Sequence, residues 1–165
     1  MKKFIGAISS AVMGALAFVF FALAAMTQKM TIGSVSDSES FSAWDMLEYK
    51  IAKMDSIGFT IYKIATIAMI VVACLLILSA VVLLLKNLNV FKTKINFTLI
   101  NNILLAVFAG LALVAVIAMF VFIQTELGDV MNESFKAFAG VGAWLNLVFG
   151  ALLCLVSCLT AKKQK

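Results

Sequence analysis

The sequence predicts an all-α integral membrane protein: a four-transmembrane-helix bundle with a short amphipathic extracytoplasmic helix between the first and second spans. Three observations lead to this fold class. Of the 165 residues, 64% are hydrophobic and only 13% are charged, which is too little charge for a typical water-soluble domain. Four apolar segments are long enough to cross a bilayer. The acids lie only in the first and third of the segments that connect them, whereas the second connecting segment and both ends of the chain contain lysine without acid. We expect residues 1–165 to form a single membrane domain.

The four predicted spans follow from length and from the absence of charge. A membrane-crossing helix needs about 20 mostly apolar residues. The segments that satisfy this without a charged residue are 4–26, 64–85, 97–123 and 137–161. Between them lie two predicted outer connectors, 27–63 and 124–136, and one predicted inner connector, 86–96.

The first span has a second interpretation. Lys2 and Lys3, the apolar run that follows and the small residues around Ala24 resemble a secretory signal peptide with its cleavage site. The apolar run is longer than the usual signal core of about 7–15 residues, which favours a retained span over cleavage near residue 24.

Charge placement predicts the orientation. Eight lysines lie in the N-terminal segment, the inner connector and the C-terminal tail, none of which contains an acid: Lys2, Lys3, Lys86, Lys92, Lys94, Lys162, Lys163 and Lys165. All eight acids lie in the two longer connectors. Short cytoplasmic loops carry the excess of lysine in membrane proteins. We therefore expect both termini on the cytoplasmic side of the plasma membrane.

Small residues at helical spacing predict where the spans pack, because close approach drives helix association in lipid. The predicted packing positions are Gly6, Ser10 and Gly14 in the first span, Ala106 and Gly110 in the third, and Gly142, Asn146, Gly150, Cys154 and Cys158 in the fourth. The alternative for the fourth row is the lining of a substrate path with Asn146 as its polar point. Helix packing is the favoured interpretation.

The first outer connector contains a predicted amphipathic helix over residues 41–54. Its apolar stripe consists of Phe41, Trp44, Leu47, Ile51 and Met54. Ser42 followed by Asp45 three residues later has the form of a helix start. The Ser-rich residues upstream, 31–40, are expected to be mobile. We expect connector 27–63 either to be a recognition surface for a partner or to cap the bundle.

Several chemistries have no residues to support them. The chain contains no His, which is the commonest metal ligand and proton carrier at neutral pH. Its three cysteines form no C-x-x-C motif, and the spans contain no acid or lysine of the kind that ion-coupled transporters place in the membrane. We therefore predict no enzyme activity, no cofactor, no metal and no nucleic-acid partner.

The layout is similar to that of claudin-like tetraspans. The likeness consists of four spans, a longer first outer connector that contains Trp44, a shorter second one, and a fourth span rich in small residues. The first connector lacks the paired cysteines and the Trp/Gly-Leu-Trp pattern of that family, so the resemblance concerns arrangement alone.

These observations favour a non-catalytic membrane protein with a structural, accessory or partner-binding role. Its expected contacts are the lipid bilayer, another membrane protein or a second copy of itself. Two alternatives stay open: a small transporter or pore formed by an oligomer, and an immunity-type protein that protects against a membrane-active peptide.

Overall fold

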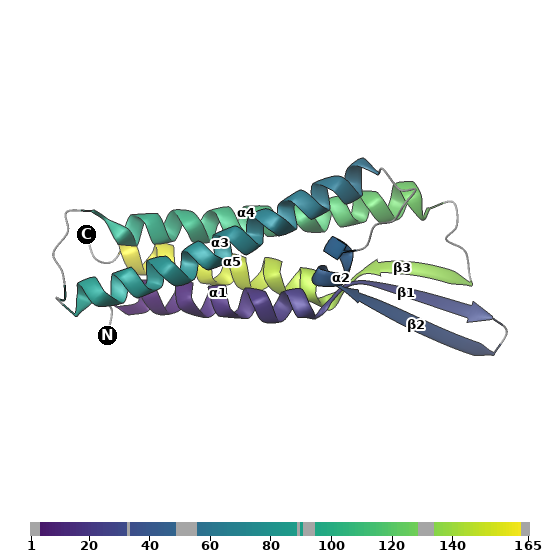
Figure 1. Ribbon diagram of the computed structural model, residues 1–165, viewed down its shortest axis with the longest axis horizontal. Helices are drawn as coiled ribbons and strands as arrows, with labels where there is room; N and C mark the ends of the chain where they lie inside the picture. Colours follow the sequence, from purple (N-terminus) through teal and green to yellow (C-terminus); the bar gives the residue numbers. More distant parts are fainter. Residues whose placement is uncertain are drawn as a thin grey trace.

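A computed structural model describes residues 4–32, 34–48, 56–88, 90, 95–128 and 134–162. Four long helices dominate it: α1 (Ile5–Ala22), α3 (Ile57–Asn87), α4 (Phe97–Glu126) and α5 (Val141–Lys162). Each is long and apolar enough to cross a membrane (Figure 1), which indicates a multi-pass membrane protein. The four predicted spans are thus confirmed as apolar helices.

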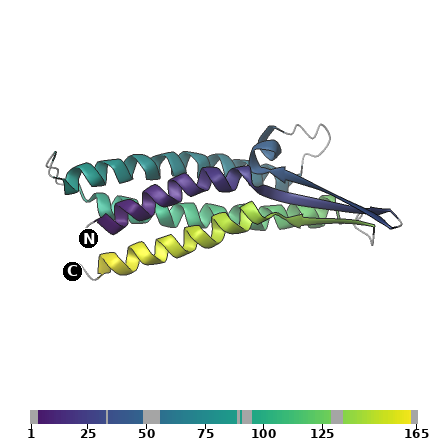
Figure 2. The ribbon, with the colours of Figure 1, turned by 90° about the horizontal axis from the view of Figure 1, so that it is seen from below.

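The helices form a closed four-membered bundle. Helix α3 packs against α1 and α4, and α5 packs against α4 and α1, so every helix lies between two antiparallel neighbours. Helix α1 begins and helix α5 ends at one end of the bundle, called here the terminal end (Figure 2). The strands lie at the opposite end, called here the sheet end.

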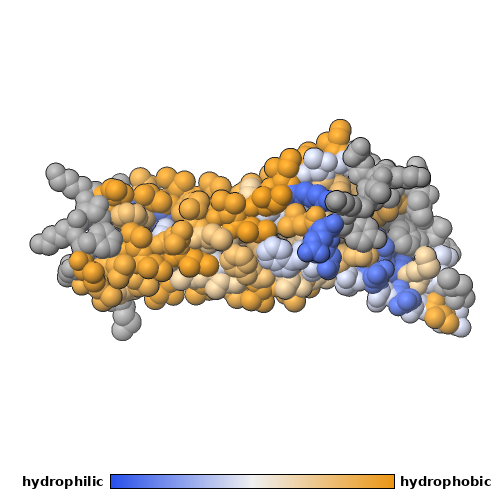
Figure 3. All heavy atoms as spheres, viewed as in Figure 1, coloured by the Kyte–Doolittle hydropathy of each residue, from blue (hydrophilic) through white to orange (hydrophobic). Residues whose placement is uncertain are grey.

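The bundle core follows a heptad-like spacing. In α4 the buried positions recur at intervals of three and four residues: Leu105, Phe108, Ala112, Ala115, Met119 and Phe122. This spacing is that of left-handed helix packing, which is common among membrane helices. The outward positions are exposed and also apolar, and hydrophobic residues cover the bundle while hydrophilic ones gather toward the sheet end (Figure 3).

A three-stranded antiparallel sheet corrects the all-α prediction. Strands β1 (Ala24–Ile32), β2 (Val35–Ser42) and β3 (Phe135–Ala139) have the order β2-β1-β3. The first predicted span is therefore too long at its end, because residues 24–26 belong to β1. The fourth predicted span likewise begins too early, because residues 137–139 belong to β3. The Ser-rich segment 31–40, expected to be mobile, is mostly the β1–β2 hairpin, in which Ile32 pairs with Val35.

The predicted amphipathic helix begins later than expected. Helix α2 (Ala43–Glu48) starts two residues after the predicted position, because Phe41 belongs to β2. The predicted start at Ser42 is confirmed by a capping box: the Ser42 backbone N–H donates to Asp45 Oδ2 at 2.8 Å, and the Asp45 backbone N–H donates to Ser42 Oγ at 3.1 Å. The expected Ile51 and Met54 lie outside the described residues.

The helices differ in length, which shapes the sheet end. Helix α3 has 31 residues and α4 has 30, whereas α1 has 18 and α5 has 22. Helix α3 begins at Ile57, seven residues before the predicted span, because Ser56 caps it by accepting from the Phe59 backbone N–H. The additional turns of α3 and α4 continue past α1 and α5 toward the strands (Figure 1).

Candidate functional site

The hairpin of β1 and β2 extends away from the bundle at the sheet end (Figure 1). Strand β2 pairs with β1 on one side only, so its other edge has no strand beside it among the described residues. Its residues from Val35 to Ser40 are all exposed. Such an edge carries backbone N–H and C=O groups that can pair with another extended chain.

The two faces of the sheet differ in charge. Lys29 pairs in register with both Ser38 of β2 and Lys136 of β3, and directly paired residues point to the same face. Asp37 and Glu39 flank Ser38 and therefore point to the opposite face. One face of the sheet thus carries two lysines, and the other carries two acids at the free β2 edge.

Helix α2 connects the sheet to the bundle. Ala43 and Met46 are its buried residues, whereas the predicted stripe at Trp44 and Leu47 is more exposed. The Trp44 ring meets Phe21 of α1 edge-on, with ring centroids 6.0 Å apart. Trp44 is thereby held against the bundle while 38% of its surface stays exposed.

The capping box also sets the charge state of Asp45. Hydrogen bonds from the Ser42 hydroxyl, at 2.7 Å, and from the Ser42 backbone N–H reach the same carboxylate oxygen. These bonds favour the ionised form and lower the pKa of Asp45 below its ordinary value. Asp45 therefore acts as a charged helix start at neutral pH.

In α1, the predicted packing residues lie inside the bundle. A Cβ added at Gly14 would lie 2.6 Å from Ile77 Cγ1 and 3.0 Å from the Ala73 carbonyl oxygen of α3, so a side chain there would force the helices apart. Gly6 lies closer to the terminal end, where an added Cβ would be 3.7 Å from Leu83. Ser10 is fully buried beside them.

In α5, the predicted row is divided between the interior and the surface. Gly142, Asn146 and Gly150 are buried, Cys154 is partly buried and Cys158 is exposed. A row of i+4 positions drifts by about 40° per step around an α-helix, so four steps lead to nearly the opposite side. Gly142 fits tightly, because an added Cβ would collide with the Phe20 carbonyl oxygen of α1.

In α4, Ala106 and Gly110 lie on the exposed side of the helix. A Cβ added at Gly110 would meet no described atom within 4 Å. Within one chain these two residues therefore do not form the predicted helix contact.

Sequence reasoning missed a set of polar contacts at the terminal end. The Asn101 amide nitrogen donates to the Gly6 carbonyl oxygen of α1 at 2.7 Å, and the Ser79 hydroxyl of α3 donates to Asn101 Oδ1 at 2.5 Å. The Ser157 hydroxyl of α5 donates to Asn102 Oδ1 at 2.5 Å. Two adjacent asparagines of α4 therefore connect it to all three other helices. Two adjacent asparagines inside an otherwise apolar span were the signal in the sequence that could have predicted these contacts.

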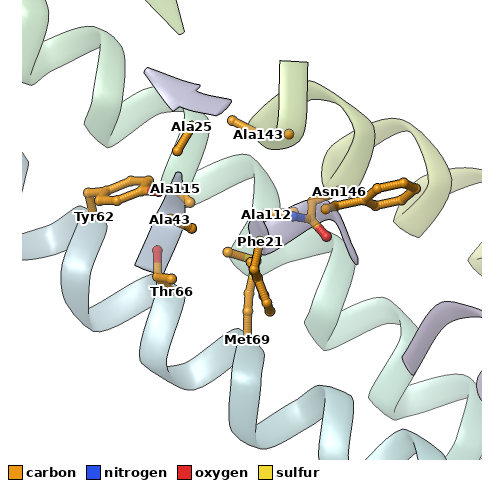
Figure 4. Close-up of a pocket in the computed structure, with 12 residues that line it drawn as sticks. Phe21, Ala25, Ala43, Tyr62, Thr66, Met69, Ala112, Ala115, Ala143 and Asn146 are labelled. Atoms are coloured by element: carbon orange, nitrogen blue, oxygen red, sulfur yellow. The ribbon is translucent and has the colours of Figure 1, made fainter. Parts of the chain in front are cut away.

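A small buried pocket lies where the bundle meets α2 and β1 (Figure 4). Its polar lining includes Thr66 of α3 and Asn146 of α5, and Ala25 of β1 and Ala43 of α2 also contribute. The pocket has a volume of about 10 Å³. Asn146 Oδ1 and Thr66 Oγ1 are both buried without a hydrogen-bond partner among the described residues.

Comparisons with family models, with curated proteins and with solved structures find no match to this chain. Within the ranges that the structure describes, no three Cys, Asp or Glu side chains gather as metal ligands, and Cys74, Cys154 and Cys158 are free thiols.

Proposed function

We propose that this chain is a non-catalytic, multi-pass protein of the cytoplasmic membrane whose sheet end faces outward and binds another protein. The observation that carries the proposal is the free β2 edge, an eight-residue strand with its residues from Val35 to Ser40 exposed. Proteins commonly recognise extended segments by adding them to such an edge, where backbone hydrogen bonds provide affinity.

The orientation is supported by the correspondence between charge and topology. Helix α1 begins, α3 ends, α4 begins and α5 ends at the terminal end. The three acid-free lysine segments of the sequence adjoin these helix ends, whereas the acidic connectors adjoin the sheet end. Lysine in short segments favours the cytoplasmic side, so the termini are inside and the sheet is outside.

The chemistry of the edge favours a basic partner segment. Strand β2 contains Asp37 and Glu39 and no lysine. Two copies of β2 brought edge to edge would place like charges close together, which opposes pairing with itself. An extended segment that carries lysine or arginine would place opposite charges there and would also supply backbone hydrogen bonds.

Transport by a single chain has less support. The buried pocket between the helices has a volume of about 10 Å³, which is near the minimum that one water molecule needs. A larger pocket of about 250 Å³ between α3 and α4 is lined by apolar residues alone. Partner binding requires only the surface already present at the sheet end.

Photo-crosslinking in the native membrane tests the proposal. A photoreactive residue at Ser38, in the middle of β2, should yield one discrete protein adduct. The same residue at Leu78, which is 62% exposed on α3 in the middle of the bundle, should capture lipid. The double substitution Asp37→Lys and Glu39→Lys should abolish the Ser38 adduct because the charges then repel. Lipid adducts alone at Ser38, or an adduct indifferent to the charge reversal, would contradict the proposal.

A further inference from the structure

One face of the sheet carries hydroxyl groups and lysines. Lys29 of β1 is paired directly with Ser38 of β2 and with Lys136 of β3, so the three side chains point to the same face. Residues two positions before and after them on each strand join that face. The hydroxyls of Thr27 and Ser40 agree with this assignment, because they lie 3.3 Å apart. We call this surface the lysine face, and its members are Thr27, Lys29, Thr31, Ser36, Ser38, Ser40, Lys136 and Phe138.

The positive charge of the lysine face is open to solvent. Both lysines are exposed, as are the three serines of β2. Asp37 and Glu39 point to the opposite face, and within the described ranges neither Lys29 nor Lys136 forms a salt bridge. Two like charges directly opposite each other oppose the pairing of their strands. A bound anion would remove this repulsion.

The donors of the lysine face suit phosphate better than carboxylate. A lysine ammonium binds phosphate as a point charge, and each serine or threonine hydroxyl can donate one hydrogen bond. A phosphate group has more acceptor oxygens than a carboxylate, so it can accept from a lysine and from adjacent hydroxyls at the same time. The hydroxyls lie on both sides of the lysine pair along the strands, so the face offers donors to several successive phosphates of a polymer.

In the orientation proposed above, the lysine face lies beyond the lipid headgroups. Helix α1 has 18 residues, so its length of roughly 27 Å is close to the thickness of the hydrocarbon core. Strand β1 follows it and leads away from the helices (Figure 1). Lys29 lies about 17 Å along this strand, at about 3.4 Å per residue. The headgroup layer is only about 5–8 Å thick, so the lipid phosphates of the same membrane do not reach the lysine pair.

We propose that the lysine face binds a phosphate-bearing polymer outside the membrane. Lys29 and Lys136 contact its phosphate groups, and the hydroxyls beside them donate hydrogen bonds. This site is distinct from the β2 edge, where backbone groups and the acids of the opposite face would meet a protein segment. Binding at one site does not require binding at the other.

Fluorescence anisotropy with a labelled linear polyphosphate tests the proposal on the purified full-length protein in a nonionic detergent. The wild-type protein should bind this polymer saturably, with an affinity that falls as added salt screens the charges. Polyglutamate with the same number of charges, which presents carboxylates, should bind several-fold more weakly. Absence of saturable polyphosphate binding, or equal affinity for the two polymers, would overturn the proposal.

Two matched double substitutions locate the bound polymer. Lys29→Gln with Lys136→Gln should weaken polyphosphate binding by about tenfold or more. Circular dichroism should show an unchanged fold, because both side chains are exposed. Lys86→Gln with Lys162→Gln removes the same charge from α3 and α5 at the terminal end and should leave the affinity nearly unchanged. Equal losses in the two double variants would show that net charge alone attracts the polymer, which also overturns the proposal. The wild-type comparison of the two polymers does not depend on either variant.

Discussion

Among single residues, the Asn101 side chain connects three helices through hydrogen bonds. It is fully buried and accepts from Ser79 while donating to the Gly6 carbonyl oxygen. Hydrogen bonds between membrane helices average about 0.6 kcal/mol and reach about 1.7 kcal/mol. Asn101 makes two of them and holds α1, α3 and α4 together.

We therefore expect Asn101→Ala to lower the free energy of unfolding by about 1–2 kcal/mol. Unfolding by SDS titration in mixed micelles measures this change. Gln124→Ala is the control, because Gln124 is an exposed polar residue of the same helix, and its substitution should change the free energy by less than about 0.5 kcal/mol. Equal effects of the two substitutions would show that the Asn101 contacts do not stabilise the bundle.

Asp45 gives a prediction about pH. Because the Ser42 hydrogen bonds lower the pKa of Asp45, the carboxyl should titrate below the ordinary pKa of an aspartate. The stabilisation of the helix start is present above that value and is lost as the pH falls through the lower folded-state pKa. An NMR titration of the Asp45 carboxyl carbon should show this, and Ser42→Ala should move the midpoint upward. A midpoint that does not move would contradict the capping role.

Which residue contacts can be predicted depends on how far apart the partners are in the sequence. The Ser42 and Asp45 pair is separated by three residues, so the sequence alone predicts it. Asn101 is 95 residues from Gly6 and 22 from Ser79, and Asn102 is 55 from Ser157. Finding those partners requires the relative rotation of four helices, which apolar composition does not determine.

At the scale of elements, two glycines test how the helices pack. Gly14→Leu should lower the free energy of unfolding by at least about 1–3 kcal/mol, the usual cost of overpacking, because the side chain would collide with Ile77 and the Ala73 carbonyl. Gly110→Leu should be neutral or stabilising by up to about 1 kcal/mol, since leucine favours a helix and the position is open. The same SDS titration compares them, and similar losses would contradict the described bundle.

The strands show the limit of prediction from apolar runs. Residues 24–26 (AAM) and 137–139 (AFA) are as apolar as the helices that they adjoin, so a hydropathy argument extends the helices through them. The Gly-Ser pair at 33–34, between Ile32 and Val35, is a known signal for a two-residue hairpin. Strand β3 lies about a hundred residues further along the chain, so no short sequence motif indicates that it pairs with β1.

At the scale of the whole molecule, the four apolar helices were predictable because lipid imposes a length and an apolar composition on each. The order of the helices around the bundle, with α1 between α3 and α5, could not be predicted from the sequence. The sheet could not be predicted either, because it pairs two strands near the first outer connector with one strand near the second. Connector 27–63, predicted as the recognition surface, contains β2, α2 and most of β1, and its role in recognition stays a prediction.

We propose that the chain crosses the membrane four times with the sheet end outside and the termini inside. Cysteine accessibility in intact cells tests it most directly. In a background with Cys74, Cys154 and Cys158 changed to Ala, Ser38→Cys should react with a membrane-impermeant maleimide in intact cells. Lys165→Cys should react only after the cells are permeabilised. Labelling of Lys165→Cys in intact cells, or protection of Ser38→Cys until permeabilisation, would contradict the account.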